Sequence, residues 1–133
     1  MSATYTTFNF VLNRLLSNTI GSLPSTIYFG FSSTPIAVDG TGATEPSGSG
    51  YARIGVSTST GFTTSTVGSS SNVAAITFAI STGSWGTLPY AAIWDASSAG
   101  NIWYYATLSP SITVVTNTTI YFDPGGVVFS MSN

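Results

Sequence analysis

The acid–base chemistry that this sequence offers rests on two arginines and four acids, because there is no lysine, histidine or cysteine. A Ser-His or Cys-His nucleophile is therefore not available, and neither is a thiolate or imidazole metal site. A glycoside hydrolase needs a pair of carboxylates, and the candidate pair is Glu45 with Asp39 or Asp95. Glu45 lies in a glycine-rich loop, whereas catalytic groups need rigid support. The sequence predicts a protein with no catalytic residues.

The other acids fit structural roles. The segment DGTG at 39–42 begins like a calcium loop, but it lacks acids at the alternate positions that such a loop requires. Asp95 and Asp123 come at the ends of expected strands beside tight turns, where an aspartate accepts hydrogen bonds from backbone amides. We therefore expect no metal site and no cofactor site.

Arg53 falls in an expected strand and needs a partner there. One interpretation is an ion pair or a carbonyl clamp, with Asp95 or Glu45. The alternative is a contact to another subunit or to a ligand. Including aromatic residues from elsewhere in the chain, the candidate interface residues are Phe10, Glu45, Tyr51, Arg53, Trp103 and Tyr105.

A cluster of aromatic residues admits two interpretations. Exposed aromatic rings can stack on sugars, but aromatic residues of β-sandwich strands mostly pack in the core or at a subunit interface. We favour the core or interface interpretation and keep carbohydrate binding as the alternative. The residues concerned are Trp85, Trp94, Trp103, Tyr104 and Tyr105.

Two strands must position most of these side chains. Residues 87–95 and 101–108 are rich in aromatic and β-branched residues, and the short connection 96–100 ends in glycine. Both faces of this pair are apolar, so we expect it in the middle of a sandwich, covered on both sides.

Turn residues divide the rest of the chain into short strands. Residues 112–115 and 118–122 are expected to form a second hairpin, and 58–72 a ragged strand that turns at 68–71. The pattern predicts a single all-β domain over 1–133, an antiparallel β-sandwich or jelly roll of about eight strands. The other strands are expected at 26–33, 51–57, 73–80 and 127–131.

One helix is expected near the N-terminus, over about 7–20, with Thr6 or Thr7 as its cap and Gly21 after its end. Its apolar stripe is expected to cover an open end of the sandwich. Phe10 lies off the stripe, either in a fraying first turn or against another subunit. The stripe comprises Phe8, Val11, Leu12, Leu15 and Leu16.

A set of alternating apolar residues should form the core, with three leucines of the helix closing one end. The loop 34–50 is expected to be mobile because it is rich in Gly, Ser, Thr and Pro. With Tyr51 it is also the segment that we expect to reach a neighbouring molecule. The expected core residues are Ile27, Phe29, Phe31, Ile54, Val56, Ile76, Phe78, Ile93, Ile102, Tyr104 and Ile120, with Leu12, Leu15 and Leu16.

Charge is scarce: 5% of residues are charged and the net charge is −2. Nucleic acid is not an expected partner because phosphates are neutralised by Lys and Arg. No apolar run approaches the ~18 residues of a membrane span, and the start lacks the pattern of a signal peptide. The absence of cysteine fits synthesis in a reducing cytosol.

A surface with so little charge gives little repulsion between copies, so we expect a homo-oligomer, most simply a trimer.

The order of three segments resembles that of small structural proteins of tailed bacteriophages, of the tail-fibre-like or virion type. These segments are GYAR at 50–53, TGSWG at 82–86 and IWDASSAGNIWYY at 93–105. Ser49, Trp94 and Ala106 depart from the family pattern, which usually has Gly, Phe and Gly at these places. The resemblance spans nearly the whole chain and implies a virion protein, assembled in the host cytoplasm.

Composition favours a capsid decoration (cement) protein that bridges capsomers and binds the major capsid protein. A receptor-binding fibre tip normally comes with a long shaft, for which 133 residues leave no room. The alternative is a tail or tail-fibre component that binds host carbohydrate.

Overall fold

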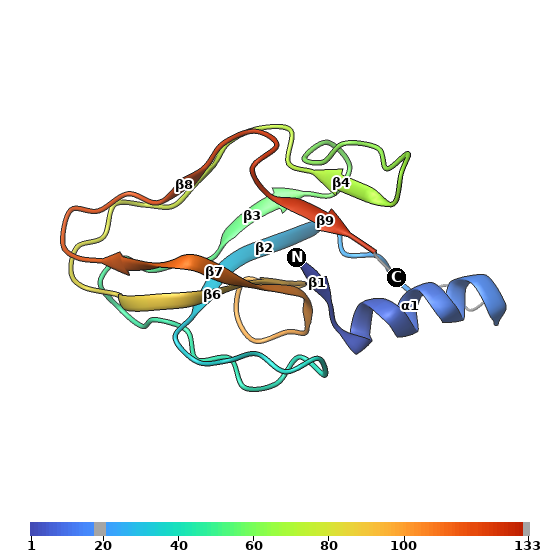
Figure 1. The fold of residues 1–133 in the computed structure, drawn as a ribbon, viewed down its shortest axis with the longest axis horizontal. Helices are drawn as coiled ribbons and strands as arrows, with labels where there is room; N and C mark the ends of the chain where they lie inside the picture. Colours follow the sequence, from blue (N-terminus) through green and yellow to red (C-terminus); the bar gives the residue numbers. More distant parts are fainter. Residues whose placement is uncertain (18–20, 132–133) are drawn as a thin grey trace.

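The computed structural model describes residues 1–17 and 21–131, and the described chain is mostly β with one short helix (Figure 1). Five strands form a main antiparallel sheet in the order β1-β7-β6-β2-β3, and two small antiparallel sheets pair β4 with β9 and β5 with β8. The predicted all-β antiparallel class is confirmed, whereas a jelly roll is not. The elements are β1 (Ser2–Ala3), α1 (Tyr5–Leu16), β2 (Thr26–Ser32), β3 (Ile54–Ser57), β4 (Ser69–Ser71), β5 (Ile76–Thr77), β6 (Gly86–Trp94), β7 (Ile102–Val114), β8 (Tyr121–Phe122) and β9 (Val128–Ser130).

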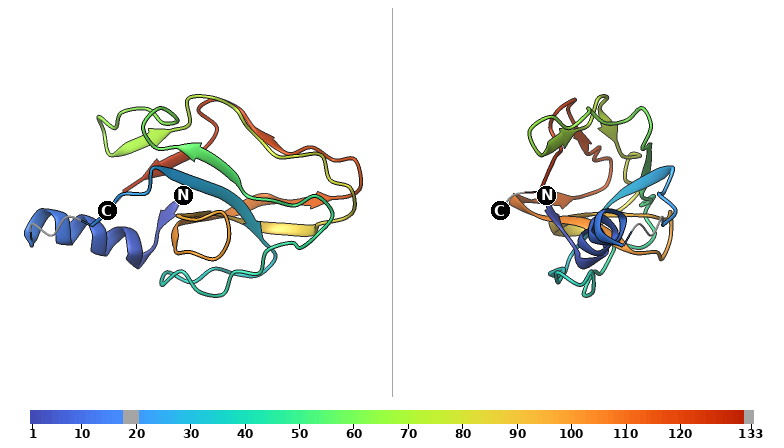
Figure 2. Two further views of the ribbon diagram at one scale, coloured as in Figure 1. Left: turned by 180° about the vertical axis from the view of Figure 1, so that it is seen from behind. Right: turned by 90° about the vertical axis from the view of Figure 1, so that its right-hand side faces the viewer.

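The β6–β7 hairpin lies at the centre of the main sheet, between β2 and β1, as its composition predicted. On one face, core residues such as Phe31, Phe78 and Ile93 pack together beneath the small sheets (Figures 1 and 2). On the other face, Trp94 packs with Ile36 from the loop 34–50. Both faces of the hairpin are therefore covered.

The predicted second hairpin, 112–115 with 118–122, is wrong. β7 continues to Val114 and its last residues pair with the start of β6, while β8 pairs with β5. The β6–β7 register shifts between the pairs Leu88↔Ile112 and Tyr90↔Thr107. Pro89 and Pro110 both lie inside this irregularity. Proline has no backbone N–H to donate, but the strands are not regularly hydrogen-bonded here, so neither proline interrupts the β-sheet ladder. Pro110 therefore did not end the strand as expected.

A second register shift lies at Trp103. Ile93 pairs with Tyr104, but Trp94 pairs with Ile102, so Trp103 is an extra residue in β7. An extra residue reverses the alternation of side chains across a strand. Ile102 consequently packs on the loop-covered face, while Tyr104 packs on the other face.

Most of the predicted core is confirmed, and the three helical leucines are the exception. Four residues are only partly buried but still pack against the core: Ile27, Ile54, Val56 and Tyr104. Leu12, Leu15 and Leu16 are exposed, so the prediction that they close one end is wrong. The residues that are buried as predicted are Phe29, Phe31, Ile76, Phe78, Ile93, Ile102 and Ile120.

The helix begins earlier than predicted because Thr4, not Thr6 or Thr7, is its N-cap. The Thr4 hydroxyl donates to the carbonyl of Ile102 at 2.6 Å, which ties the helix start to β7. α1 ends at Leu16 with Ser17 as C-cap. The predicted end near residue 20 lies outside the described residues. α1 projects from one end of the β body instead of covering it (Figure 2).

The loop 34–50 has anchors that its composition did not reveal. The Ser33 amide donates to the Thr44 carbonyl at 2.9 Å, and the Thr44 amide donates to the Ser32 hydroxyl at 2.8 Å. Thr34 donates to the Gly42 carbonyl at 2.6 Å. These bonds hold the returning half of the loop against the end of β2, and Glu45 adds an ion pair to Arg53.

Candidate functional site

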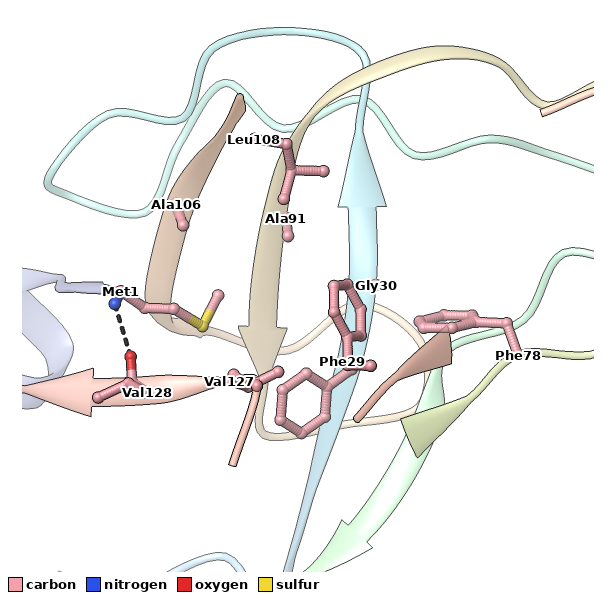
Figure 3. Close-up of a pocket in the computed structure, with 11 residues that line it drawn as sticks. Met1, Phe29, Gly30, Phe78, Ala91, Ala106, Leu108, Val127 and Val128 are labelled. Atoms are coloured by element: carbon pink, nitrogen blue, oxygen red, sulfur yellow. Dashed lines mark hydrogen bonds between the residues drawn. The ribbon is translucent and has the colours of Figure 1, made fainter. Parts of the chain in front are cut away.

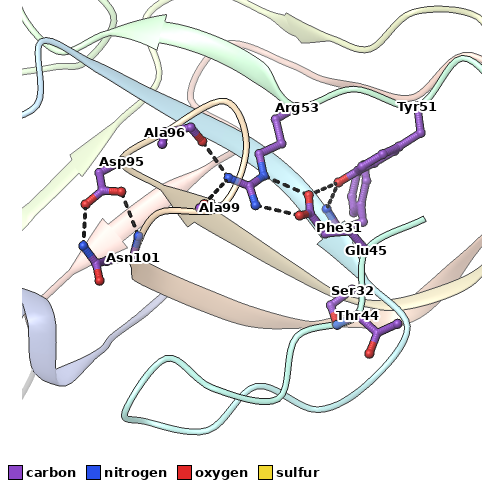
Figure 4. Close-up of polar contacts among 10 residues, drawn as sticks. All are labelled: Phe31, Ser32, Thr44, Glu45, Tyr51, Arg53, Asp95, Ala96, Ala99 and Asn101. Carbon is purple, nitrogen blue, oxygen red and sulfur yellow. Dashed lines mark hydrogen bonds and ion pairs between the residues drawn. The ribbon is translucent and has the colours of Figure 1, made fainter. Parts of the chain in front are cut away.

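Arg53, directly before β3, is the centre of a buried polar cluster, and its side chain is 4% exposed (Figure 4). Its Nε and Nη2 atoms donate to the two carboxylate oxygens of Glu45, at 2.8 and 2.6 Å. The guanidinium also lies 4.0 Å from the centre of the Trp94 ring, in cation–π geometry. The predicted ion pair is confirmed, with Glu45 and not Asp95 as the partner.

The same guanidinium clamps the tip of the central hairpin. Its Nη1 atom donates to the carbonyls of Ala96 and Ala99, at 2.6 and 2.8 Å. Ala99 has a φ of 51°, a left-handed conformation that is strained for a residue with a Cβ, and the Arg53 contact helps to hold it. Arg53 thus joins the loop 34–50 and the start of β3 to the hairpin tip, which lies 43 to 46 residues further along the chain.

Tyr51 completes this cluster. Its hydroxyl donates to Oε1 of Glu45 at 2.9 Å and accepts the amide of Phe31 at 3.0 Å. Burial raises the pKa of Tyr51 well above its usual value, so the hydroxyl stays protonated. Gly30 is required beneath it, since a Cβ there would lie 2.6 Å from the Tyr51 hydroxyl and 2.9 Å from Trp94. The cluster is a built structural unit with its hydrogen bonds satisfied internally.

Replacing Tyr51 with phenylalanine should lower the free energy of unfolding by about 1–2 kcal/mol at neutral pH. The reason is that the Phe31 amide loses its acceptor and Glu45 loses a donor inside a partly buried site. Urea denaturation at pH 7 measures the change. An unchanged stability would contradict the role assigned to this hydroxyl.

The raised pKa of Tyr51 also predicts a loss of stability in alkali. Above about pH 10 the tyrosine of the unfolded chain releases its proton while the folded one keeps it, so unfolding is favoured as the pH rises. Tyr51→Phe should lose less stability than the wild type between pH 8 and pH 11. Some alkaline sensitivity should remain, because burial also raises the pKa of Tyr104. Equal alkaline losses in both proteins would contradict this assignment.

The carboxylates proposed for a glycosidase pair are engaged separately. Asp39 accepts the amide and hydroxyl of Thr41, and the hydroxyl contact is the main cause of the lowered pKa of its carboxyl. Asp95 accepts both the backbone and the side-chain N–H of Asn101, and burial opposes but does not outweigh the lowering of its pKa by these bonds. In residues 1–17 and 21–131, no group of three acids could hold a metal ion. Each of these acids closes a turn or an ion pair.

Four of the five aromatic residues considered for sugar stacking are buried or packed against other rings. Trp85 and Trp94 are buried, and Trp85 donates its indole N–H to the Ser49 carbonyl at 2.8 Å. Trp103 is half-buried beneath Phe10 of α1, with ring centres 5.5 Å apart. Tyr104 is half-buried and packs edge-on against Phe129 at 5.1 Å. This packing supports the core interpretation and gives no support to sugar stacking.

The six candidate interface residues therefore fall into separate groups. Glu45, Tyr51 and Arg53 meet in the polar cluster, while Phe10 and Trp103 pack together at the base of α1. Tyr105 belongs to neither group: it packs against the core on the loop-covered face and also lines a shallow hollow beside α1. All six residues thus make contacts within the chain.

An apolar pocket of about 260 Å³ opens between the main sheet and β9 (Figure 3). The paired small residues Ala91 and Ala106 leave the space, and Phe29, Leu108 and Val127 close it. The lining is almost entirely apolar, which gives a ligand little to orient it.

The surface that the sequence interpretation missed is the apolar stripe of α1. Its residues were identified from their spacing, but they were assigned to the core, and Tyr5 was not included with them. The structure places them on an exposed face. No helix in the described part of the chain is long and apolar enough to cross a membrane.

A comparison with protein families identifies the chain. The family model described as podophage GP4 fiber I protein gp80 matches residues 2–130. No curated protein matches the chain. The resemblance to structural proteins of tailed bacteriophages is confirmed by a match over nearly the whole sequence. This chain belongs to the podophage GP4 fiber I protein gp80 family.

Proposed function

We propose that this chain is a structural subunit of a bacteriophage fibre and that it acts by binding other virion proteins, without catalysis. The observation that carries the proposal is the match of residues 2–130 to a fibre family. The engagement of Glu45, Asp39 and Asp95 agrees with a structural role, because each carboxylate accepts hydrogen bonds from residues of the same chain.

The family match favours the fibre alternative over the capsid-decoration interpretation. The decoration interpretation rested on scarce charge and small size. Low charge reduces repulsion between any repeated subunits, whether they stand on a capsid or in a fibre. Composition therefore could not locate the protein on the particle, and the expected major capsid protein partner loses its basis.

Binding of host carbohydrate is not part of the proposal. Most of the aromatic residues considered for sugar stacking are buried or packed against other rings, as Trp94 and Trp103 show. A row of exposed apolar residues lies along α1, although other exposed apolar residues are scattered over the β body. Protein–protein contact is the function that such a surface serves.

Particles that lack this chain should retain their DNA as well as intact particles do, but should adsorb more slowly to host cells. A fibre subunit contributes to host attachment and not to the closed capsid lattice. The two measurements are particle survival under heat or osmotic shock and the rate of adsorption. Early DNA loss with normal adsorption would contradict the fibre proposal and restore the decoration interpretation.

A further inference from the structure

The outer edge of β7 is open beyond the short strand β1. β1 pairs with β7 only at Tyr104 and Tyr105, and no other described strand pairs with this edge. Pro110 has no backbone N–H and therefore ends the stretch along which a further strand could pair in line with β1. We refer to residues 106–109 as the open edge.

The backbone of Thr107 faces outward on the open edge. The Thr4 amide donates to the Trp103 carbonyl at 2.9 Å, so the backbone of Trp103 is turned toward β1. Backbone N–H and C=O groups alternate between the two edges of a strand with a period of two residues. The pairing with β6 is regular over 104–107, so the alternation brings Tyr105 and then Thr107 to the β1 side. Thr107 consequently presents its N–H and C=O to an incoming strand.

The apolar pocket of about 260 Å³ opens at the same edge (Figure 3). Phe29 lies at its inner end and is 3% exposed. Ala106 and Leu108, which flank Thr107, also line the pocket, and both are half-buried. Val128 lines it as well and is 47% exposed. The exposure of the lining therefore rises from the inner end of the pocket toward the open edge.

The pocket has room for a large side chain. Protein interiors are close-packed, and the walls of an unfilled space lose dispersion contacts. A dry apolar cavity of about 150 Å³ is large enough for benzene, so this pocket can hold the ring of an aromatic side chain. The apolar lining alone does little to orient a ligand, whereas a strand on the open edge would be oriented by its backbone hydrogen bonds.

Continuing β1 along the open edge defines the register of such a strand. β1 pairs as far as Tyr105, so the position opposite Ala106 belongs to Met1, which lines the pocket. The side chains of directly paired residues lie on the same face of a sheet. The next residue of an added strand would pair with the backbone of Thr107. The residue opposite Leu108 would then place its side chain on the face that contains the pocket.

We propose that the open edge and the apolar pocket form one site, which binds an extended segment of another virion protein as an added strand in line with β1. The backbone of this segment pairs with Thr107, and an apolar or aromatic side chain enters the pocket. This mode of recognition uses main-chain hydrogen bonds for affinity and a side-chain pocket for specificity. The proposal rests on the proposed function, because it gives the fibre subunit a partner.

The composition of the site favours an uncharged segment from a different protein. No charged side chain lines the pocket, so a charged side chain inserted there would be buried without a partner. A second copy of this chain is poorly suited through β3, the other edge of the main sheet. Ile54 and Val56 of β3 pack against their own core, and Gly55 and Ser57 are too small to fill the pocket.

The test is an NMR titration of the full chain with a blocked peptide, acetyl-Thr-Phe-Thr-Phe-Thr-amide. We expect saturable shifts at the amides of residues 106–109 and at Ala91, which lines the pocket. A peptide with alanine in place of both phenylalanines should bind at least about tenfold more weakly, because it buries less apolar surface.

Two variants test the edge and the pocket separately. Thr107→Pro removes the outward N–H without removing a bond of the β6–β7 ladder, so it should abolish binding of the peptide. Ala106→Leu fills the mouth of the pocket and should remove the preference for phenylalanine over alanine. The matched control is Thr107→Val, which keeps the N–H and should bind as the wild type does. Urea denaturation checks that each variant is folded.

Several results would overturn the site. One is the absence of saturable binding to the wild type at peptide concentrations up to about 1 mM. Others are unchanged binding to folded Thr107→Pro, equal binding of the two peptides, or an unchanged preference for phenylalanine in Ala106→Leu. Binding of indole in the pocket without binding of the peptide would indicate a small-molecule site instead. Amides of the open edge that become protected from exchange only at high protein concentration would show that a second copy covers the edge.

Particles carrying the variants separate this site from the proposed function. Loss of Thr107→Pro from particles that incorporate Thr107→Val supports the site, and equal incorporation of both overturns its use by a virion partner. If the wild type binds the peptide but is located outside the fibres, the site stands and the fibre function is overturned. If the chain is located in the fibres but does not bind the peptide, the fibre function stands and the site is overturned.

Discussion

Replacing Phe29 with alanine is expected to lower the free energy of unfolding by about 3–5 kcal/mol, in the range of buried aromatic truncations. Phe29 lies in β2, is 3% exposed, and packs against the rings of Phe62 and Phe129, at centre distances of 6.3 and 6.2 Å. Its removal would leave a cavity between the main sheet and the layer that contains β9, where the neighbouring strands cannot fully collapse. Urea denaturation measures the loss.

Tyr121→Ala is the matched control, because Tyr121 is an aromatic strand residue that is 62% exposed. Its removal should cost less than about 1 kcal/mol, since little apolar surface leaves water when it folds. A loss at Phe29 as small as that of the control would show that the layers do not pack around this ring.

Replacing Arg53 with alanine should cost about 3 kcal/mol of stability. Removing one partner of a buried ion pair costs 3–5 kcal/mol when the other charge is left buried. The Glu45 side chain is 27% exposed and so keeps some hydration, which places the expected loss at the lower end of that range. The loss also includes two hydrogen bonds to the hairpin tip, at Ala96 and Ala99.

The matched control for Arg53 is Arg14→Ala, the other arginine of the chain, which is exposed on α1. Its effect should stay below about 1 kcal/mol, the limit for most surface charges. The double variant Arg53→Ala with Glu45→Ala should lose less than the sum of the two single losses, because both report one interaction. Equal losses for the two arginines, or strictly additive losses, would contradict the cluster.

Local sequence patterns predicted the positions of the strands better than they predicted which strands pair. Alternation over residues 26–33 and the aromatic runs on either side of residues 96–100 correctly predicted β2 and the central hairpin. The sequence did not show that two prolines would share one irregularity, which allows β7 to run through Pro110. Strand pairing is a long-range property, and β8 pairs with β5 across more than 40 residues.

The ion pair of the polar cluster could be predicted from the sequence, because a buried arginine side chain requires an acceptor for its N–H groups. An arginine in an expected strand needs a partner, and the sequence offered Glu45 or Asp95 for Arg53; the structure shows Glu45. The loop 34–50 gave no such signal, because its anchors are hydroxyls and amides that occur throughout the chain.

The sequence of α1 alone could not predict whether its apolar face points toward the β body or toward solvent. An apolar stripe indicates that a helix buries one face, but it does not indicate whether the face meets the same chain or another molecule. Here the orientation is set by contacts of Thr4, Thr7 and Phe10 with β7. These contacts hold the helix by residues other than those of the apolar stripe, which is therefore left exposed.

The central claim, that this chain is a fibre subunit, is tested most directly by its copy number and position on purified particles. Quantitative mass spectrometry against the major capsid protein gives the copy number, and electron cryo-microscopy of antibody-labelled particles gives the position. We expect a small number of copies and labels confined to the fibres. Hundreds of copies spread over the capsid surface, or a chain absent from the particle, would contradict the claim.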